Sequence, residues 1–184
     1  MRAACLETLV PPLVIHTIGH STHSADAFLA LLVTHEIRQV ADIRTIPYSR
    51  RHPHFGREAL QTWLAASGIG YRHFPALGGR RRPWPDSNNT AVRHPGFRGY
   101  ADHMQTPEFQ EGLEALEAFA AEGTTTVMCA EALWWQCHRR FLADALFVRN
   151  VKVQHIMSSA TAKPHELSAF GRVHDARVTY PGLV

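Results

Sequence analysis

Short apolar runs rich in β-branched residues alternate with longer segments of helical periodicity, and this alternation constrains the fold more than any other feature. The apolar runs predict five strands, at residues 13–18, 39–43, 71–74, 124–129 and 151–156. The segments between them predict four helices, at residues 25–35, 57–66, 107–122 and 136–150. Such alternation indicates a parallel sheet covered by helices. We therefore expect a Rossmann-like, three-layer α/β fold with a mostly parallel five-stranded sheet and helices on both faces.

Two further segments lack this periodicity. Residues 75–99 are rich in Pro and Gly and predict a long loop, which in a compact domain is usually functional or disordered. The C-terminal extension, residues 157–184, carries a short helical pattern at 166–171 and a weak strand pattern at 176–180. The length of 184 residues suits a single domain with a sizeable core, so we expect one domain over residues 1–184.

Composition excludes several classes of protein. The longest apolar stretches, such as residues 27–33, fall far short of the roughly 20 residues that a bilayer-spanning helix needs. No clear signal peptide begins the chain, so we expect a cytoplasmic protein without a membrane partner. Cys5, Cys129 and Cys137 are too few, and odd in number, for the disulfide framework of a secreted domain, which favours reduced thiols.

Polar residues follow several of the predicted strands, where ligands of open α/β sheets bind. These candidates are Gly19, His20 and Ser21 after the first strand, Asp42 and Arg44 at the second, Cys129 and Glu131 after the fourth, and His155 in the fifth. Side chains alternate along a strand, so Asp42 and Arg44 share one face, as Cys129 and Glu131 do while the extended conformation lasts. Each pair is therefore placed to converge on one ligand.

Each of these groups also has a purely structural interpretation. The turn at Gly19 either brings backbone N–H groups to an anion or is an ordinary strand-to-helix turn with a capping serine. Asp42 and Arg44 form either a catalytic pair or a structural ion pair at the sheet edge. Cys129 is either a reactive thiol or a buried apolar one, since free cysteine is among the most buried residue types.

Several motifs in this order give the chain a family resemblance. They are Thr17-Ile18-Gly19-His20-Ser21, Asp42-Ile43-Arg44 with Pro47 and Ser49, Leu77-Gly78-Gly79, Phe97-Arg98-Gly99-Tyr100, and Cys129-Ala130-Glu131 followed by Cys137-His138-Arg139. The chain resembles the bacterial domain-of-unknown-function 488 family over about residues 15–156. The resemblance implies a shared pocket and names no reaction. This chain departs from the family at Trp134-Trp135 and in its run of arginines at residues 80–82.

The cysteine motifs favour thiolate chemistry. Cys129 ends a strand and precedes a helix that starts with His138 and Arg139, where the helix dipole and nearby cations would lower its pKa. Cysteine phosphatases and sulfur transferases place an arginine at a fixed distance behind the cysteine, where this chain has Trp135. The sequence therefore assigns neither of these two activities.

A metal site is a second chemical interpretation, with Cys129, Cys137, His138 and perhaps His20 as ligands. Seven residues separate the two cysteines, so no C-x-x-C knuckle is present. Neighbours within a helix diverge by about 100°, which argues against Cys137 and His138 binding one ion. The prediction from sequence is therefore no metal ligand and no assigned cofactor, and a zinc or iron protein stays an alternative.

Charge and aromatic residues together suggest the ligand. The formal net charge is only +3, but arginines cluster at residues 50–57 and 80–82, which favours an anionic partner. Aromatic residues in or near these loops can stack on a base: Tyr48, Trp84, Tyr100, Trp134 and Trp135. We expect a small phosphate-bearing ligand, such as a nucleotide, or a nucleic acid.

The leading hypothesis is an enzyme that acts on such a substrate. Arg44 and Arg139 would bind the anion. His20, together with Glu131 or Asp42, would transfer protons, and Cys129 would be the nucleophile or a wall of the pocket. The motif residues Gly19, Ser21, Ser49, Tyr100, Cys137 and His138 complete the expected ligand-binding set. The alternatives are a non-catalytic module that binds nucleic acid or another ligand, and an interaction scaffold.

Overall fold

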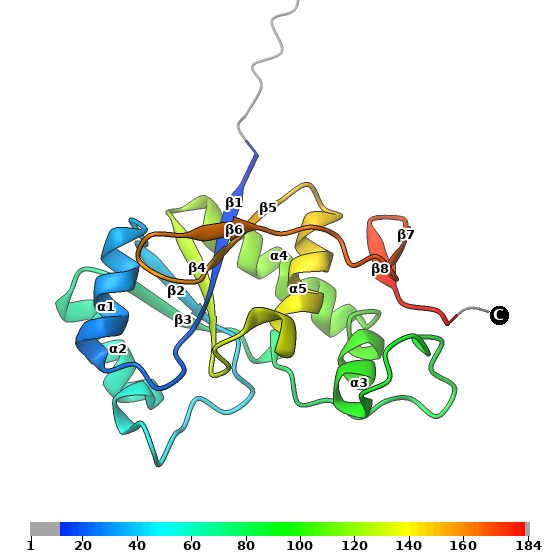
Figure 1. Ribbon diagram of the computed structural model, residues 1–184, viewed down its shortest axis with the longest axis horizontal. Helices are drawn as coiled ribbons and strands as arrows, with labels where there is room; N and C mark the ends of the chain where they lie inside the picture. The colour runs from blue at the N-terminus through cyan, green and yellow to red at the C-terminus, as the bar shows by residue number, and fades with distance from the viewer. Residues whose placement is uncertain (1–11, 183–184) are drawn as a thin grey trace, which may run out of the picture.

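A six-stranded sheet runs through the centre of the computed structural model, which describes residues 12–182 (Figure 1). Its strands are β1 (Val14–Gly19), β2 (Gln39–Asp42), β3 (Gly70–His73), β4 (Thr125–Cys129), β5 (Lys152–Ile156) and β6 (Ala162–Pro164), in the order β3-β2-β4-β1-β5-β6. The first five are mutually parallel, and β6 is antiparallel to β5. A separate hairpin is formed by β7 (Arg172–His174) and β8 (Arg177–Thr179).

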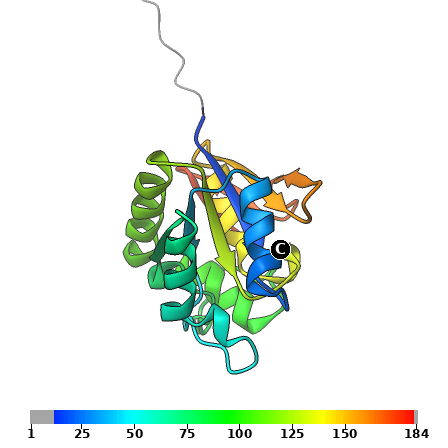
Figure 2. The same ribbon diagram turned by 90° about the vertical axis from the view of Figure 1, so that its left-hand side faces the viewer.

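Helices cover both faces of the sheet. Two of them, α1 (Ala25–Thr34) and α2 (Arg57–Ala66), share a core cluster on one face, and Figure 2 views the molecule from their side. The other three, α3 (Pro95–His103), α4 (Pro107–Ala121) and α5 (Arg139–Phe147), build the larger cluster on the opposite face. The predicted three-layer, mostly parallel α/β fold is thus confirmed, with β6 added at one edge.

Local sequence explains where the main elements lie. Strand β4 is buried at all five positions, which fits its run of β-branched and apolar residues between β1 and β2. The Oγ atom of Ser24 accepts a hydrogen bond from the Ala27 amide and caps α1. Thr106 caps α4 in the same way, with Pro107 in the first turn. Within residues 12–182, none of the helices combines the length and apolar character needed to cross a bilayer.

Two predicted boundaries were wrong. The segment 75–99 was expected to be a loop throughout, but α3 begins at Pro95 within it. The periodicity of α3 is hidden because its buried face includes Gly99, Asp102 and His103 rather than apolar side chains alone. The expected helix 136–150 begins only at Arg139, since residues 134–136 form a separate 3₁₀ turn.

The C-terminal extension also differs from its prediction. Residues 166–171 contain a turn instead of the expected short helix, and β6 and β7 were not predicted. The extension is nevertheless anchored in the core. The Tyr180 hydroxyl donates to Asp144 Oδ2 of α5 at 2.8 Å, and the Ser168 amide donates to Asp144 Oδ1 at 2.9 Å. A buried carboxylate that needs several donors therefore fixes the path of residues 168–180.

Candidate active site

One open cavity of about 360 Å³ lies at the carboxyl ends of β1, β2 and β4. Seven of the residues expected at the site line it: His20, Arg44, Ser49, Cys129, Glu131, Cys137 and His138. Thr45, Ile46, Tyr48, Gly79, Arg80, Phe97, Ala130 and Gln136 complete its wall. The stretches that meet here are far apart in sequence, and the parallel sheet brings them to one rim.

The cavity forms where the loops after β1 and β4 leave the sheet toward opposite faces. The amides of His20 and Ser21 donate to the carbonyls of Cys129 and Ala130, both at 2.9 Å, which extends the pairing beyond the strands. A Cβ atom on Gly19 would collide with the Glu131 carbonyl. Glycine at position 19 is therefore required by the close approach of the two loops. This is the switch point at which doubly wound sheets bind their ligands.

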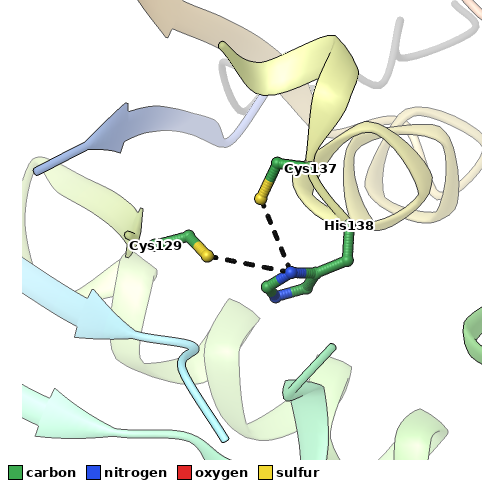
Figure 3. Close-up of side chains that lie close together, drawn as sticks. All are labelled: Cys129, Cys137 and His138. Atoms are coloured by element: carbon green, nitrogen blue, oxygen red, sulfur yellow. Dashed lines mark hydrogen bonds between the residues drawn. The ribbon is translucent and has the colours of Figure 1, made fainter. Parts of the chain in front are cut away.

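The floor of the cavity holds two thiols and an imidazole that point toward one another (Figure 3). The Sγ atoms of Cys137 and Cys129 lie 3.5 and 3.8 Å from Nδ1 of His138. Cys129 ends β4, and Cys137 has an extended backbone immediately before α5. The three ligand atoms all lie within 4.8 Å of one another. The expected divergence of Cys137 from His138 does not occur, because Cys137 precedes the helix instead of lying within it.

The second nitrogen of His138 fixes the state of the imidazole. Nε2 lies 3.3 Å from the carbonyl oxygen of Ile43, so Nε2 carries the proton and donates it. Nδ1 therefore presents its lone pair to the thiols. The edge of Tyr100 packs against the ring at a centroid distance of 5.1 Å. Gly79 lies so close to Nδ1 that a Cβ atom there would collide with it.

The two cysteines have opposite pKa shifts. The pKa of Cys129 is raised well above its usual value, first because its thiol donates to Cys137 and then because it is buried. The pKa of Cys137 is lowered well below its usual value, first by that hydrogen bond from Cys129 and also by the charge of Arg139. Cys137 is therefore the more acidic thiol of the pair, whereas the sequence pointed to Cys129 as the nucleophile.

Arg139 stabilises the cysteine loop from behind. Its guanidinium is 1% exposed, and Nη2 donates to the carbonyls of Glu131 and Ala132. Among residues 12–182 it forms no ion pair with a carboxylate, so its positive charge acts on the nearby thiols. Arg139 does not line the cavity and does not reach a ligand there.

Asp42 and Arg44 form a bidentate ion pair. Nε and Nη2 of Arg44 donate to the two carboxylate oxygens at 2.8 and 2.6 Å, and Tyr71 donates to Oδ2 at 2.9 Å. Arg44 Nη1 also donates to the carbonyl of Phe55 at 2.8 Å. Asp42 is fully buried outside the cavity wall, so the interpretation as a structural pair describes its geometry better than a proton-transfer role.

His20 is held neutral beside this pair. Its ring stacks on Phe55 with centroids 4.2 Å apart, and Nδ1 donates to the Ser21 carbonyl at 3.0 Å. Nε2 faces Arg44 Nη1 at 3.4 Å. Burial, and then the charge of Arg44, lower the pKa of His20 to about 4. His20 therefore accepts a hydrogen bond from Arg44 near neutral pH and carries no charge.

Other predicted residues lie behind the cavity wall. Gly19 and Ser21 shape the turn, and Tyr100 is fully buried with its hydroxyl donating to the Leu77 carbonyl at 3.1 Å. His155, in β5, belongs to a separate buried network with Thr17 and His165. Sequence reasoning did not place Arg80 in this cavity, because nothing in the run of arginines shows which one turns toward the sheet.

Comparison with known proteins agrees with the family resemblance. The model of the family described as "Domain of unknown function DUF488" matches residues 24–146, more than half of the chain. No curated protein and no solved structure matches the chain. The matched region runs from the residue that caps α1 into α5 and includes Asp42, Arg44 and the whole Cys129–His138 cluster. The chain therefore belongs to the DUF488 family.

Proposed function

We propose that the protein is an enzyme that acts on a phosphate-bearing substrate, a nucleotide or a nucleic acid, in the cavity at the carboxyl ends of its strands. One observation carries this proposal. A thiol, an imidazole, a carboxylate and an exposed guanidinium face the same cavity, from Cys137, His138, Glu131 and Arg80. The volume of about 360 Å³ lies within the range of pockets that hold small organic ligands.

The charges at the rim support an anionic substrate. Among residues 12–182, Glu131 is the only carboxylate that lines the cavity, against the guanidinium groups of Arg44 and Arg80. Arg44 is neutralised by Asp42, whereas Arg80 has an exposed side chain and forms no ion pair among the described residues. Its backbone is fixed by a hydrogen bond from its amide to Thr45 Oγ1 at 3.2 Å. We therefore assign phosphate binding to Arg80 rather than to Arg44 or Arg139.

We assign proton transfer to Glu131. Its side chain is exposed at the cavity, and its backbone is held by Arg139. His20 faces Arg44 with its only lone pair, so it acts as a positioning residue for Arg44. Cys137, as the more acidic thiol of the cysteine pair, is the nucleophile or the ligand that the cavity offers to the substrate.

A second hollow favours the alternative of a nucleic-acid-binding module. It has about 400 Å³, and Gly79, Arg80 and Phe97 line it as well as the first cavity. Arg82 and His94 extend it away from the thiols, and Arg82 is exposed. A continuous basic groove of this kind can follow a strand of phosphates.

The decisive experiment is a turnover assay. The purified chain is incubated with nucleoside mono-, di- and triphosphates and with single- and double-stranded oligonucleotides, and products are detected by ³¹P NMR and mass spectrometry. Glu131→Gln is expected to lower kcat by about 100-fold or more, the usual loss when a proton-transfer group is removed. Arg80→Ala is expected to raise KM. Arg172→Ala, an exposed arginine of β7 outside both hollows, is the matched control and leaves both constants unchanged.

Salt dependence separates the enzyme from the binding module. A module binds oligonucleotides without product, and Arg80→Ala and Arg82→Ala each reduce its salt slope by about one unit. In that case Cys129→Ser has no effect on binding. Binding without turnover in any substrate class would therefore replace the enzyme by the module.

A further inference from the structure

We propose that Cys129, Cys137 and His138 form a three-ligand site for a thiophilic divalent cation, Zn²⁺, whose fourth coordination position opens into the cavity. This inference goes beyond the proposed function, because the ion binds or fails to bind whatever the substrate is. Figure 3 shows the three donors converging on one point. Cys129 comes from the end of β4, His138 from the cap of α5, and Cys137 from the residue before that cap.

The spacing of the donor atoms matches a tetrahedral zinc site. Zinc–sulfur bonds of about 2.3 Å and zinc–nitrogen bonds of about 2.0–2.1 Å place tetrahedral S and N ligands about 3.5 Å apart. The observed distances from His138 Nδ1 are 3.5 Å to Cys137 Sγ and 3.8 Å to Cys129 Sγ. All three donors lie within 4.8 Å of one another.

The surroundings orient His138 as a ligand. Its Nε2–H donates to the Ile43 carbonyl at 3.3 Å, so its Nδ1 lone pair points to the thiols. Ligating histidines are typically oriented by such a second hydrogen bond to a backbone carbonyl. A nucleophilic pair would require one cysteine and one histidine. A second thiol at the same point adds nothing to such a pair, whereas a metal ion needs it as a third ligand.

Charge also favours two thiolates with one divalent ion. Arg139 is buried behind the cluster and has no carboxylate partner among the described residues. It therefore stabilises negative charge on both sulfurs. Soft sulfur donors with one imidazole select zinc over magnesium or calcium, which prefer oxygen ligands.

The site has an entry path and one open side. The two cysteines and His138 are each less than 10% exposed, yet all three line the open cavity. Three protein ligands with a fourth position open to solvent or substrate are the arrangement of catalytic zinc sites, whereas structural sites are closed by four. A bound ion would thus face Glu131 and Gln136 across the cavity.

The test uses the full chain and the metal alone. The chain is purified under reducing conditions, stripped with a chelator and titrated with Zn²⁺ and Co²⁺. We expect one equivalent to bind, with thiolate-to-cobalt charge-transfer bands and the d–d bands of a tetrahedral ion. X-ray absorption of the zinc form is expected to show two sulfurs at about 2.3 Å and a nitrogen at about 2.0–2.1 Å. This measurement on the unaltered chain does not depend on how any variant folds.

Variants then locate the ion. Cys137→Ser and His138→Gln are each expected to weaken Zn²⁺ binding by at least about 100-fold, the upper end of what the loss of an outer-shell partner costs. His174→Gln, an exposed histidine of β7, is the matched control and leaves affinity unchanged. A cobalt spectrum without thiolate bands, or one that both cluster variants leave unaltered, would overturn the site. A Cys129–Cys137 disulfide in the chain together with no bound ion would overturn it as well.

Discussion

The indole of Trp134 lies flat on the imidazole of His155, with ring centroids 3.9 Å apart and planes only 3° from parallel. This stack attaches the 3₁₀ turn at Trp134–Gln136 to β5, three residues before Cys137. His155 is itself the centre of a buried chain of hydrogen bonds. Thr17 Oγ1 lies 2.7 Å from its Nδ1, and His165 Nδ1 lies 3.0 Å from its Nε2. The position of Cys137 thus depends on the stacking of Trp134 on His155 of β5.

Replacing Trp134 should therefore cost far more than replacing its neighbour. Trp134→Ala removes the stack and is expected to lower the free energy of unfolding by about 3 kcal/mol, the lower end of the range for truncation of a large aromatic residue. Trp135 is 43% exposed, so Trp135→Ala should cost less than about 0.5 kcal/mol. Urea denaturation of both variants measures the difference. Equal losses would show that the stack does not stabilise the turn.

Buried neutral histidines predict a loss of stability in mild acid. Burial, and then the neighbouring His165, lower the pKa of His155 from 6.5 to about 3, and His20 is lowered to about 4. The folded state therefore excludes protons that the unfolded chain binds. Each such histidine stabilises fully above pH 6.5 and loses at most about 1.4 kcal/mol per pH unit as the pH falls from 6.5 toward its folded pKa.

This pH dependence can be assigned to one residue. The free energy of unfolding, measured by urea at several values between pH 6.5 and 4, should fall less steeply for His155→Gln than for the unaltered chain. His174→Gln is the control, because His174 is exposed on β7. A slope that His155→Gln does not change would contradict the assignment.

The Asp42–Arg44 pair predicts a strong effect of removing either partner alone. Asp42→Asn leaves the buried guanidinium of Arg44 without its counter-charge, and we expect a loss of about 3–5 kcal/mol. The double variant Asp42→Asn with Arg44→Met should cost less than the sum of the two single changes, since it leaves no unpaired charge.

A more exposed ion pair provides a comparison for the Asp42→Asn variant. Glu117 and Arg149 pair at 2.6 Å with both side chains about a quarter exposed. Glu117→Gln should cost no more than about 1 kcal/mol. If Asp42→Asn costs as little as Glu117→Gln, the pair at the cavity wall does not have the structural importance that its geometry indicates.

Gly79 predicts a defect in the thiol cluster. A methyl group on Gly79 would meet His138 Nδ1, so Gly79→Ala must displace the imidazole. We expect a loss of about 1–3 kcal/mol of stability from overpacking. Zn²⁺ affinity should fall by at least about 10-fold, as it does when the orientation of a ligand is disturbed. Gly70→Ala is the matched control, because the nearest atom to its Cβ would be Gln39 Cγ at an ordinary 3.5 Å. Unchanged zinc binding in Gly79→Ala would contradict the close contact.

The sheet was predictable because its signals are local. The apolar run of β4 and the caps at Ser24 and Thr106 can be read directly in the sequence, and the alternation of elements implies a parallel sheet. In such a sheet the residues at strand ends share one edge, so the meeting of His20, Arg44 and Cys129 followed from the topology. Helix α3 escaped prediction because tertiary contacts, rather than an apolar stripe, decide which of its residues are buried.

The details of the site depended on contacts that spacing does not reveal. Treating Cys137 and His138 as helix neighbours separated their side chains, but the helix starts three residues later than its periodicity indicates. The sequence also shows no sign that Asp42 neutralises Arg44, or that Arg80 alone of its run faces the thiols, since both facts depend on side-chain conformations at a rim built from distant segments.

The hydrogen bond from His138 to Ile43 decides which ring nitrogen of His138 carries the proton, and it does so whatever side chain stands at position 43. The acceptor is a peptide oxygen at the end of β2, and every amino acid supplies the same atom at that place. Replacement of the isoleucine can loosen packing, yet it cannot take the acceptor away. Which nitrogen of the ring stays bare is therefore dictated by how the end of β2 is placed against the cap of α5, and only a shift of one against the other would change it.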